Sequence, residues 1–305
     1  MRIVLFGKNG QLGREFQKTL PALGEVFSMG REDLDIASHW AIKDILTKLK
    51  PDLIINASAY TAVDLAETQV ELATKINSVA PGVMADAAHH LNAAFIHFST
   101  DYVFDGNKKI PYTENDITNP LNVYGKSKLA GEKNVIAAGD ACLIFRTSWV
   151  YSLSGNSFVI KVLEWSRKNK TLKIVNDQVG SPTWARMLAE SVSRILVQDK
   201  ADLLDAIREK HGIYHLAGIG SVSRYEWARQ ILAFDPRRTE QLVQSVDPAP
   251  SSEFPTPAVR PAFSALDCTR FTNTFKLSLP AWADALQKAM TESHAFPALG
   301  LQADS

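Results

Sequence analysis

An apolar segment followed at once by three glycines at intervals of three opens the chain. Residues 2–6 (RIVLF) have the composition of a buried strand, and residues 7–13 read GKNGQLG. A helical pattern follows, so Gly7, Gly10 and Gly13 lie in a turn between a strand and a helix. Glycines in that context permit a tight turn and let backbone N–H groups approach a pyrophosphate at the helix N-terminus. A plain glycine-rich turn is the alternative, but the position directly after an apolar strand favours a dinucleotide-binding loop.

Apolar segments alternate with amphipathic segments throughout the first half of the chain. Uninterrupted apolar strands between helices are typical of a parallel sheet that helices cover on both faces. The sequence therefore predicts an α/β fold with a Rossmann-type, doubly wound parallel sheet. Strands are predicted at 2–6, 25–29, 52–58, 93–100 and 141–149, and helices at 11–20, 39–49, 64–91 (with Pro81 as a candidate break) and 122–138.

The second half of the chain is less regular. We predict an NAD(P)-binding Rossmann domain over residues 1–150 and a smaller C-terminal α/β substrate-binding lobe over residues 151–305, with some later segments returning to the sheet. Residues 246–261 are rich in proline and are predicted to be extended and loop-like. Helices are predicted at 157–168, 183–197, 224–234 and 281–291, and short strands near 172–176 and 212–217.

Charge and cysteine content exclude several classes of partner. Lys plus Arg and Asp plus Glu each number 33, so no excess of positive charge favours nucleic acid or an anionic membrane. Cys142 and Cys268 are too few for a disulfide scaffold or a zinc site, and they fit a reducing cytosol. No apolar stretch approaches the roughly 20 residues that a membrane helix needs, and the N-terminal apolar run reaches Gly7 too soon for a signal peptide. We expect a soluble, cytoplasmic protein without nucleic-acid or membrane partners.

The segment after the second predicted strand bears on the choice of cofactor. An acid usually stands there when the ribose 2′-hydroxyl of NAD is bound, but this chain has Arg31 at that place. A guanidinium suits a 2′-phosphate, which favours NADPH. Glu32 and Asp33 follow directly, so a solvated surface role for Arg31 carries similar weight. After the third long strand, the small residues of NASAYT at 56–61, Ala57 among them, let the backbone approach the cofactor.

A tyrosine and a lysine stand four residues apart at the start of a predicted helix. In YGKSK, Tyr124 and Lys128 lie on one helix face. A nearby ammonium group and the helix N-terminus both favour a phenolate, so each should lower the phenol pKa from its usual value near 10. Such a pair suits the protonation of an alkoxide as a hydride arrives, or the reverse. Such a pair alone occurs by chance in many helices. It indicates an oxidoreductase here because it follows the glycine loop and the strand end described next.

One predicted strand ends in hydroxyl groups and a carboxylate (FSTDYVFDG, residues 98–106). Ligands of a doubly wound sheet bind beyond the carboxyl ends of its strands. The Thr100 hydroxyl can therefore donate to a substrate carbonyl, alongside Tyr124, where negative charge develops. Ser99 should point to the opposite face because successive side chains alternate along a strand. These residues predict a catalytic set of Thr100, Tyr124 and Lys128.

The remaining candidates carry weaker signals. His89 and His90 are predicted at a helix surface, and His97 and His215 within strands are predicted to be structural. No H-E-x-x-H motif or Cys/His cluster indicates a metal. Trp149 ends a predicted strand and is either a core residue or an aromatic ring that stacks on a sugar.

The chain also contains the motifs GKNGQLG, LDI (34–36), NASAYTAVDLAE, STDYVFDG, PLNVYGKSKLAGE, FRTSWVY, NDQVGSPT and PTPAVRP. Together they resemble the dTDP-4-dehydrorhamnose reductases, a family of extended short-chain dehydrogenase/reductases. The resemblance extends from residue 1 to about residue 290. FRTSWVY, NDQVGSPT and the proline-rich motif are far more specific than the Tyr–Lys pair.

The resemblance implies a reaction and roles for individual residues. The family reduces the 4-keto group of dTDP-4-dehydro-β-L-rhamnose to dTDP-L-rhamnose with NADPH or NADH. By motif, Thr100 and Tyr124 contact the C4 oxygen, Tyr124 donates the proton, and Lys128 holds the nicotinamide ribose and tunes the phenol. Thr100, Asp101 and Trp149 contact the deoxyhexose. Cofactor contacts fall on Gly10, Gln11 and Leu12 at the pyrophosphate, on Asp35 and Ile36 near adenine, and on Ala59, Tyr60 and Thr61.

The resemblance also implies an assembly and a metal. The family is commonly dimeric, and magnesium at the dimer contact is described for some members. Glu15, Glu190 and Glu292 are the candidate Mg²⁺ ligands, although nothing in their spacing requires a metal. Solvated carboxylates on helix faces are the favoured alternative. We expect a homodimer whose small-molecule partner is a dTDP-sugar.

Two other functions share much of this pattern. A nucleotide-sugar 4,6-dehydratase needs an additional acid and base, which resemble T-D-E at the strand end, whereas this chain has Tyr102 in the third place. The regulatory β subunit of methionine adenosyltransferase resembles the family and acts by binding a partner. The complete set of Thr100, Tyr124 and Lys128, together with SWVY, favours an oxidoreductase. Another nucleotide-sugar reductase is a further alternative.

Overall fold

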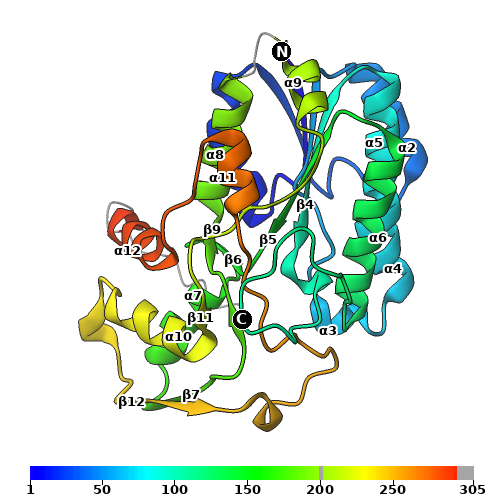
Figure 1. The fold of residues 1–305 in the computed structure, drawn as a ribbon. Helices are drawn as coiled ribbons and strands as arrows, with labels where there is room; N and C mark the ends of the chain where they lie inside the picture. The colour runs from blue at the N-terminus through cyan, green and yellow to red at the C-terminus, as the bar shows by residue number, and fades with distance from the viewer. Residues whose placement is uncertain (199–201, 294–305) are drawn as a thin grey trace.

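A six-stranded parallel sheet forms the centre of the molecule, with the strand order β10-β5-β4-β3-β1-β2 (Figure 1). The structure is a computed structural model, and it describes residues 1–198 and 202–293. The strands are β1 (Arg2–Phe6), β2 (Glu25–Met29), β3 (Leu53–Asn56), β4 (Ala94–Thr100), β5 (Cys142–Thr147) and β10 (Gly212–His215). The predicted α/β fold with a Rossmann-type sheet is confirmed.

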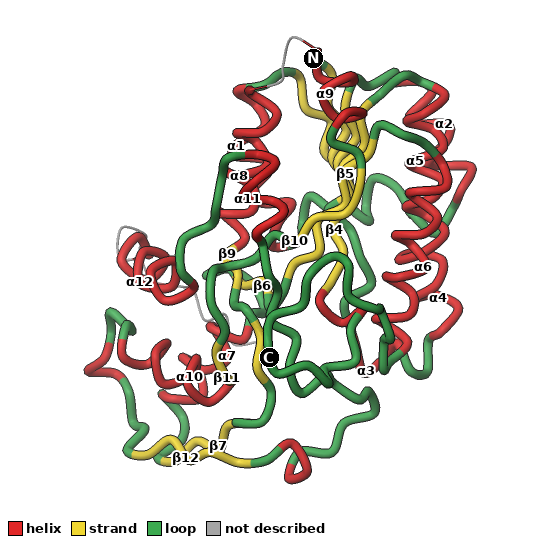
Figure 2. Tube along the Cα trace, in the orientation of Figure 1, coloured by secondary structure: helices red, strands yellow, loops and turns green. Residues whose placement is uncertain are grey.

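Helices cover both faces of this sheet (Figure 2). One face packs against α1 (Gln11–Thr19), α8 (Ala185–Gln198), α9 (Leu203–Glu209) and α11 (Thr269–Phe275). The opposite face packs against α2 (His39–Leu49), α5 (Ala80–His90) and α6 (Val123–Ala138). Helices α8, α9 and α11 come from the second half of the chain, as does the edge strand β10, so this half contributes to the central layers.

The predicted helix over residues 64–91 is divided, but not at Pro81. The structure has α3 (Val63–Ala66) and, after a turn, α4 (Val70–Thr74), a π-helical segment (Lys75–Val79) and α5. Pro81 stands in the first turn of α5, where a missing N–H costs little. The prediction of a break at Pro81 is therefore wrong, and the interruption lies before Val70.

A second group of elements packs around its own apolar cluster, which includes the buried Trp227. Strand β12 pairs with β7, so part of the proline-rich segment is a strand where a loop was predicted. The elements are β6 (Val150–Tyr151), α7 (Phe158–Ser166), β7 (Thr171–Val175), β8 (Val179–Gly180), β9 (Thr183–Trp184), β11 (Val222–Ser223), α10 (Arg224–Ala233), β12 (Ser245–Ala249) and α12 (Trp282–Ser293).

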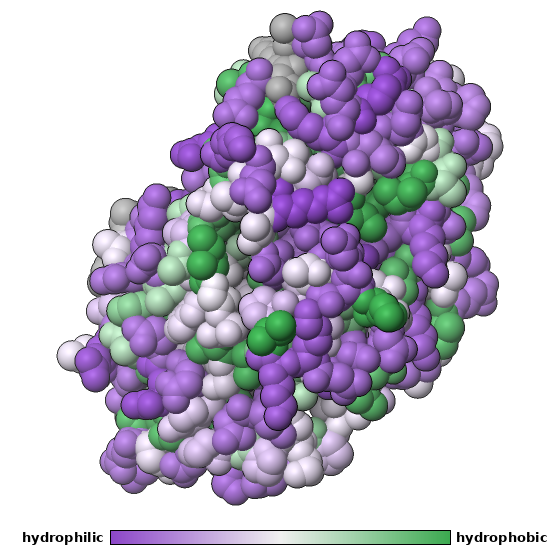
Figure 3. Space-filling view, viewed as in Figure 1, coloured by the Kyte–Doolittle hydropathy of each residue, from purple (hydrophilic) through white to green (hydrophobic). Residues whose placement is uncertain are grey.

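The surface is largely polar where it can be seen. Figure 3 shows one face on which hydrophilic residues predominate and apolar residues form small, separate groups. Within residues 1–198 and 202–293, no helix is both long enough and apolar enough to cross a membrane.

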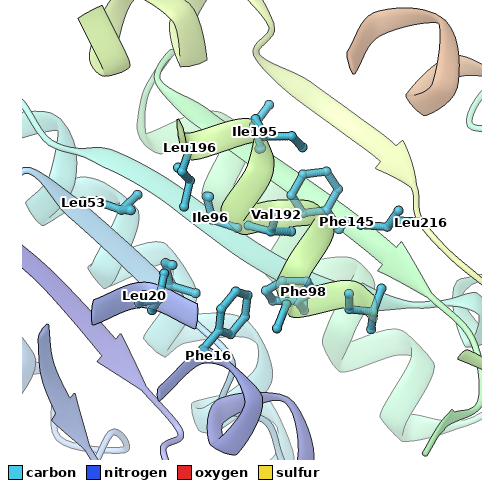
Figure 4. Close-up of a cluster of buried hydrophobic side chains, with 14 of the residues drawn as sticks. Phe16, Leu20, Leu53, Ile96, Phe98, Phe145, Val192, Ile195, Leu196 and Leu216 are labelled. Atoms are coloured by element: carbon cyan, nitrogen blue, oxygen red, sulfur yellow. The ribbon is translucent and has the colours of Figure 1, made fainter. Parts of the chain in front are cut away.

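The core explains why the strands are apolar on both faces. Along β1, Ile3 and Leu5 face the layer that contains α1 and α8, while Val4 and Phe6 face the layer that contains α2 and α5. Figure 4 shows the first of these layers, where side chains of α1, β4, β5 and α8 meet. Burying each such side chain stabilises the fold by about 1.5–3 kcal/mol. The sheet is thereby a rigid support for the loops at its carboxyl edge.

Candidate active site

The carboxyl ends of the parallel strands place several polar segments at one edge of the sheet. Phe6 of β1 pairs with Asn56 of β3, and Thr100 of β4 pairs with Thr147 of β5. The loops that follow these residues therefore leave the sheet together. Such an edge is where doubly wound folds bind their ligands.

Thr100 and Tyr124 meet at this edge. Thr100 is buried at the end of β4, and its Oγ1 accepts from the Tyr102 N–H at 3.2 Å. Asn122 caps the N-terminus of α6 by accepting from the Gly125 N–H at 2.8 Å, which fixes the first helical turn that carries Tyr124. The Thr100 hydroxyl and the Tyr124 phenol form a hydrogen bond. The structure thus brings together two members of the predicted catalytic set.

The pKa of Tyr124 differs from the expectation. Burial raises this pKa far above its usual value near 10, the hydrogen bond with Thr100 opposes the rise, and the charges of Asp101 and Tyr102 add to it. Lys128 is not among the groups that lower it. The predicted lowering of the phenol pKa by Lys128 is therefore wrong for this structure, because the phenol is buried while the ammonium group points elsewhere.

Lys128 extends from α6 into the sheet. Its side chain is 1% exposed, and Nζ lies 2.6 Å from the Phe98 carbonyl oxygen and 3.2 Å from His97 Nε2. Burial lowers the pKa of Lys128 to about 8, although the charge of Glu132 opposes this shift. His97, predicted to be structural, is in direct contact with a member of the predicted catalytic set.

Asp101 is held by hydroxyl groups. Its carboxylate accepts from Thr100 Oγ1 at 3.1 Å, from Ser148 Oγ at 2.9 Å and from Ser264 Oγ at 2.5 Å. Burial raises the pKa of Asp101, and these three hydrogen bonds oppose the rise. The carboxylate lies directly beside Thr100, at the carboxyl end of β4.

Trp149 has neighbours on its ring that the sequence did not reveal. The Arg224 guanidinium carbon lies 3.6 Å from the ring centroid, and the Trp227 ring stacks at 5.5 Å. A side chain at Gly180 would collide with the indole. The structure therefore packs Trp149 against the second apolar cluster, with a cation on its ring.

Sequence reasoning missed two arginines that meet at Tyr102. The Tyr102 hydroxyl forms hydrogen bonds with both Arg224 and Arg260. Arg260 also forms an ion pair with Asp64 at 2.7 Å. Arg260 belongs to the motif PTPAVRP and could have been noticed there, whereas nothing in the sequence around Arg224 indicated a site.

The glycine loop has the geometry that a dinucleotide requires. Gly7 has a φ of +89°, and a Cβ there would lie 2.7 Å from the Ser58 backbone nitrogen, so only glycine fits. A Cβ at Gly13 would collide with the Gly7 carbonyl oxygen, which explains how closely α1 packs on the loop. Gly10 caps α1 without any side-chain hydrogen bond, which leaves the first N–H groups of the helix for an anion.

One buried hydrogen-bond acceptor in this loop lacks a donor within the described part of the chain. This acceptor is Gln11 Oε1. Leu12 is buried next to it. The backbone N–H groups of the glycine loop suit a dinucleotide pyrophosphate, and this orphaned acceptor suits a donor such as a ribose hydroxyl.

The loop after β3 is fixed by a residue that the sequence did not single out. Asn77 accepts from the Tyr60 N–H at 2.8 Å and donates to the Tyr60 carbonyl at 3.0 Å. The same amide donates to Ser127 Oγ of α6 at 3.0 Å. Asn77 therefore joins the predicted cofactor loop to the helix that carries Tyr124 and Lys128. Ala57 and Ala59 are partly buried in this loop, and Thr61 is exposed.

The segment after β2 leaves Arg31 exposed. Lys8 of the glycine loop forms ion pairs with Glu32 at 3.1 Å and with Asp33 at 2.5 Å. The two acids are thus directed at Lys8 and do not pair with Arg31. Farther along, Asp35 is exposed and Ile36 packs at the edge of the apolar layer that contains α2.

The expected magnesium ligands do not form a metal site in this structure. Glu15 of α1 forms ion pairs with Lys18 at 2.9 Å and with Arg186 of α8 at 3.4 Å. Arg186 also forms an ion pair with Glu292 of α12. A guanidinium thus lies between the two carboxylates, and Glu190 makes neither contact. Within the described ranges, no group of three or more His, Cys, Asp or Glu residues could hold a metal ion. Within the described part of this one chain, these three glutamates therefore do not assemble into a Mg²⁺ site.

Comparisons with known proteins identify the family of this chain. A family model described as the RmlD substrate binding domain matches residues 1–295. The dTDP-4-dehydrorhamnose reductase of Salmonella typhimurium is 38% identical over 304 residues, covering 96% of this chain and 98% of that protein.

Two solved structures of the same enzyme class are also similar. A dTDP-4-dehydrorhamnose reductase from Clostridium acetobutylicum has a TM-score of 0.87 and 37% identity, covering 96% of this chain and 100% of that chain. The enzyme from Bacillus anthracis, solved in complex with NADP, has a TM-score of 0.86 and 32% identity, covering 95% of this chain and 99% of that one. The predicted family is confirmed: the chain belongs to the RmlD substrate binding domain family, that of the dTDP-4-dehydrorhamnose reductases.

Proposed function

We propose that this protein reduces the 4-keto group of dTDP-4-dehydro-β-L-rhamnose to form dTDP-L-rhamnose, with NADPH or NADH as the reductant. The observation that carries the proposal is the hydrogen bond between Thr100 and Tyr124 at the carboxyl edge of the sheet. The pair shares this edge with the glycine loop that follows β1, whose tight backbone suits a dinucleotide. A keto oxygen placed at this pair would face two hydroxyl groups.

The side chains can supply a proton and an oxyanion contact. When bound, the reduced nicotinamide supplies the hydride. Because its pKa is raised, the Tyr124 phenol stays protonated at neutral pH and can donate its proton to the alkoxide oxygen. The Thr100 hydroxyl can turn its proton from Asp101 to the same oxygen, since Ser148 and Ser264 continue to stabilise that carboxylate.

Two arginines are suited to binding an anionic substrate. Arg224 and Arg260 converge on Tyr102, which is two residues after Thr100 in the chain. We assign to them the attraction of the diphosphate of the sugar nucleotide, because guanidinium groups form charge-assisted hydrogen bonds with phosphate oxygens. Asp101, bound to Thr100, and Trp149, packed against Arg224, are our candidates for contacts with the deoxyhexose.

In this proposal, two parts of the chain bind different molecules, one the cofactor and the other the substrate. Residues 1–150, joined by β10 and the helices of the second half that pack on the sheet, bind the cofactor. Residues 151–305 mainly form the substrate-binding lobe, around the second apolar cluster; residues 199–201 and 294–305 lie outside the described residues. The resemblance further predicts a homodimer, which sedimentation would test. We expect the cytoplasm as the location, in keeping with the free thiols of Cys142 and Cys268.

The reaction itself is tested with purified protein. NADPH should be oxidised only when the 4-keto-6-deoxy sugar nucleotide is supplied. Tyr124→Phe should lower turnover by about 10²–10⁴-fold while cofactor binding is retained. Full turnover by that variant would remove Tyr124 from the mechanism.

The same assay separates the alternatives. A 4,6-dehydratase would form product from a 4-hydroxy sugar nucleotide without net consumption of cofactor. A regulatory subunit would form a stable complex with a synthetase and turn over no keto sugar. Either outcome would contradict the proposed reduction.

A further inference from the structure

A buried hydroxyl group stands without a partner at the end of β5. Thr147 is the last residue of this strand and is 8% exposed, and its Oγ1 makes no hydrogen bond within residues 1–198 and 202–293. Buried polar atoms are nearly always hydrogen-bonded, because an unpaired one has lost its contacts with water and gained nothing in return. At the edge where a doubly wound sheet binds its ligands, such an atom is a candidate ligand contact.

Thr147 lies next to Thr100 in the sheet. The two residues are direct partners in the register of β4 and β5. Side chains of such partners point to the same face of a sheet, because both strands share one pleat. Thr100 forms the hydrogen bond with Tyr124 that carries the proposed reduction. Thr147 therefore adjoins the place where, in that reaction, a hydride reaches the keto carbon.

The alternation of side chains along β5 shows which face Thr147 occupies. Phe145 packs in the apolar layer that contains α1 and α8 (Figure 4), whereas Arg146 pairs with Glu132 of α6 on the opposite face. The next residue, Thr147, thus returns to the face of α1. The glycine loop leads into α1, so Thr147 and this loop serve the same side of the sheet.

A second buried atom without a partner belongs to a segment that contacts the end of β5. Gln11 is the first residue of α1, and its Oε1 has no hydrogen bond in the part of the chain that the structure describes. Its Nε2 donates to the Val150 carbonyl oxygen at 3.5 Å, and Val150 is three residues after Thr147. The start of α1 and the end of β5 therefore meet, and each supplies one buried polar atom that a bound molecule could satisfy.

The strand order indicates which part of a dinucleotide reaches Thr147. The glycine loop follows β1, and the segment after the neighbouring β2 is the predicted adenosine side. With the pyrophosphate at the glycine loop, the nicotinamide half extends the other way, across β3 to Thr100 on β4. The next strand is β5. The carboxamide is attached to the ring carbon beside the one that gives the hydride, so it too lies close to Thr100 and within reach of this strand.

We propose that Thr147 binds the carboxamide of the nicotinamide ring. The inference rests on the proposed function, in which the hydride is transferred beside Thr100. A hydroxyl group both donates and accepts, and a carboxamide offers N–H donors and a carbonyl acceptor, so the two groups are complementary in either orientation of the carboxamide. The contact restrains rotation of the ring and thus holds one of its faces toward the keto carbon.

Removal of the hydroxyl group tests the proposal by binding alone. Thr147→Val should raise the Kd of NADPH about three- to tenfold and leave the Kd of 2′-phospho-ADP-ribose, which lacks the nicotinamide, unchanged. NADH and ADP-ribose form the equivalent pair of ligands. Thr147→Ser keeps the hydroxyl and should bind NADPH within about twofold of the wild-type protein. Isothermal titration calorimetry measures each Kd in the absence of the sugar nucleotide.

A matched control uses the same substitution in another strand. Thr171 begins β7, in the second group of elements, and its Oγ1 contacts Ser245 Oγ at 3.1 Å. Thr171→Val should leave the Kd of both ligands unchanged. Thermal unfolding verifies that each variant is folded, and Thr147→Val should not unfold at a lower temperature than wild type, because it removes a hydroxyl that makes no hydrogen bond within the described residues.

Several results would overturn the assignment of Thr147. One is an unchanged Kd of NADPH in folded Thr147→Val. Another is equal weakening of NADPH and 2′-phospho-ADP-ribose, since the lost contact would then lie outside the nicotinamide. A third is weaker binding of dTDP-L-rhamnose alone, which would place Thr147 at the substrate.

Failure of the proposed function has a different signature. It would appear as a wild-type protein that binds NADPH but oxidises none when the keto sugar nucleotide is supplied. The comparison of NADPH with 2′-phospho-ADP-ribose still decides whether Thr147 contacts the nicotinamide in that case, because it requires no turnover.

Discussion

Thr100 Oγ1 donates a hydrogen bond to Asp101 Oδ1 at 3.1 Å, so the hydroxyl proton already has a partner before substrate binds. Thr100→Val keeps the shape but removes the donor to a developing oxyanion. We expect kcat to fall about 10²–10³-fold in this variant, and to stay within about tenfold of wild type in Thr100→Ser, which restores the hydroxyl. Steady-state kinetics with the keto sugar nucleotide check this, and equal loss in both variants would contradict it.

Substitution of Arg31 tests whether the protein prefers NADPH to NADH. Arg31 is exposed after β2, and the neighbouring acids pair with Lys8 instead. If its guanidinium binds a 2′-phosphate, Arg31→Ala should raise the KM for NADPH about tenfold or more and leave that for NADH unchanged. Arg229→Ala, an exposed arginine on α10, is the control. Equal KM values for NADPH before and after the change would assign Arg31 to the solvated surface.

Chelation of the wild-type protein and substitution of Arg186 test whether Mg²⁺ binds near Glu15 and Glu292. Because its guanidinium lies between Glu15 and Glu292, we expect EDTA to leave turnover and Tm of the wild-type protein unchanged. Arg186→Glu would bring a third carboxylate to this place and create the oxygen ligands that Mg²⁺ or Ca²⁺ prefers. The variant should unfold at a lower temperature than wild type, and Mg²⁺ or Ca²⁺ should raise its Tm.

Arg186→Gln controls for the loss of the arginine alone. It removes the same ion pairs without supplying a carboxylate, so divalent cations should not raise its Tm. A fall in wild-type turnover or Tm on chelation would show that the arginine does not replace a metal.

Breaking a buried ion pair behind the site should lower the free energy of unfolding more than breaking an exposed one. Glu132 and Arg146 are 2% and 4% exposed and form a bidentate pair. Glu132→Gln leaves the guanidinium without its counter-charge and should lower the free energy of unfolding by about 3–5 kcal/mol. Glu253→Gln, which breaks the exposed pair with Lys173, should cost less than about 1 kcal/mol. Urea denaturation of both variants gives the comparison, and similar losses would contradict the effect of burial.

Acid should destabilise the protein through His215. Burial lowers the pKa of His215 from 6.5 to about 3, and its Nδ1 faces the Tyr112 carbonyl oxygen at 3.0 Å. Between these two pKa values the unfolded chain binds a proton that the folded protein does not. Stability is therefore lost as the pH falls below about 6.5, by up to about 1.4 kcal/mol per pH unit.

A neutral substitute isolates this contribution. In His215→Asn, the amide can still donate to the Tyr112 carbonyl, and no group titrates. The free energy of unfolding, measured by urea at several pH values below about 6.5, should fall less steeply in this variant. Identical slopes in both proteins would show that His215 does not determine the acid sensitivity.

Much of the fold and part of the site could be predicted from the sequence. The apolar strands, the helical periodicity and the glycine loop determined the sheet, because burial on both faces and a positive φ at Gly7 restrict residue types locally. The proximity of Thr100 and Tyr124 could be expected because β4 ends, and the next long helix α6 begins, at the carboxyl edge of the sheet. Each of these features depends on residues that are close in sequence or repeated at a fixed spacing.

Tertiary structure alone decided the contacts between distant residues. His97 looked like a structural histidine, yet Asn56 and Lys128 reach it from 41 and 31 residues away. Arg224 on Trp149 and Arg186 between Glu15 and Glu292 join segments whose separation carries no periodic signal. The protonation states follow in turn, because the pKa of Tyr124 or Lys128 depends on burial and on which partners the packed chain brings near. The sequence by itself determined which groups are present at the site, and the tertiary structure determined which proton each of them holds.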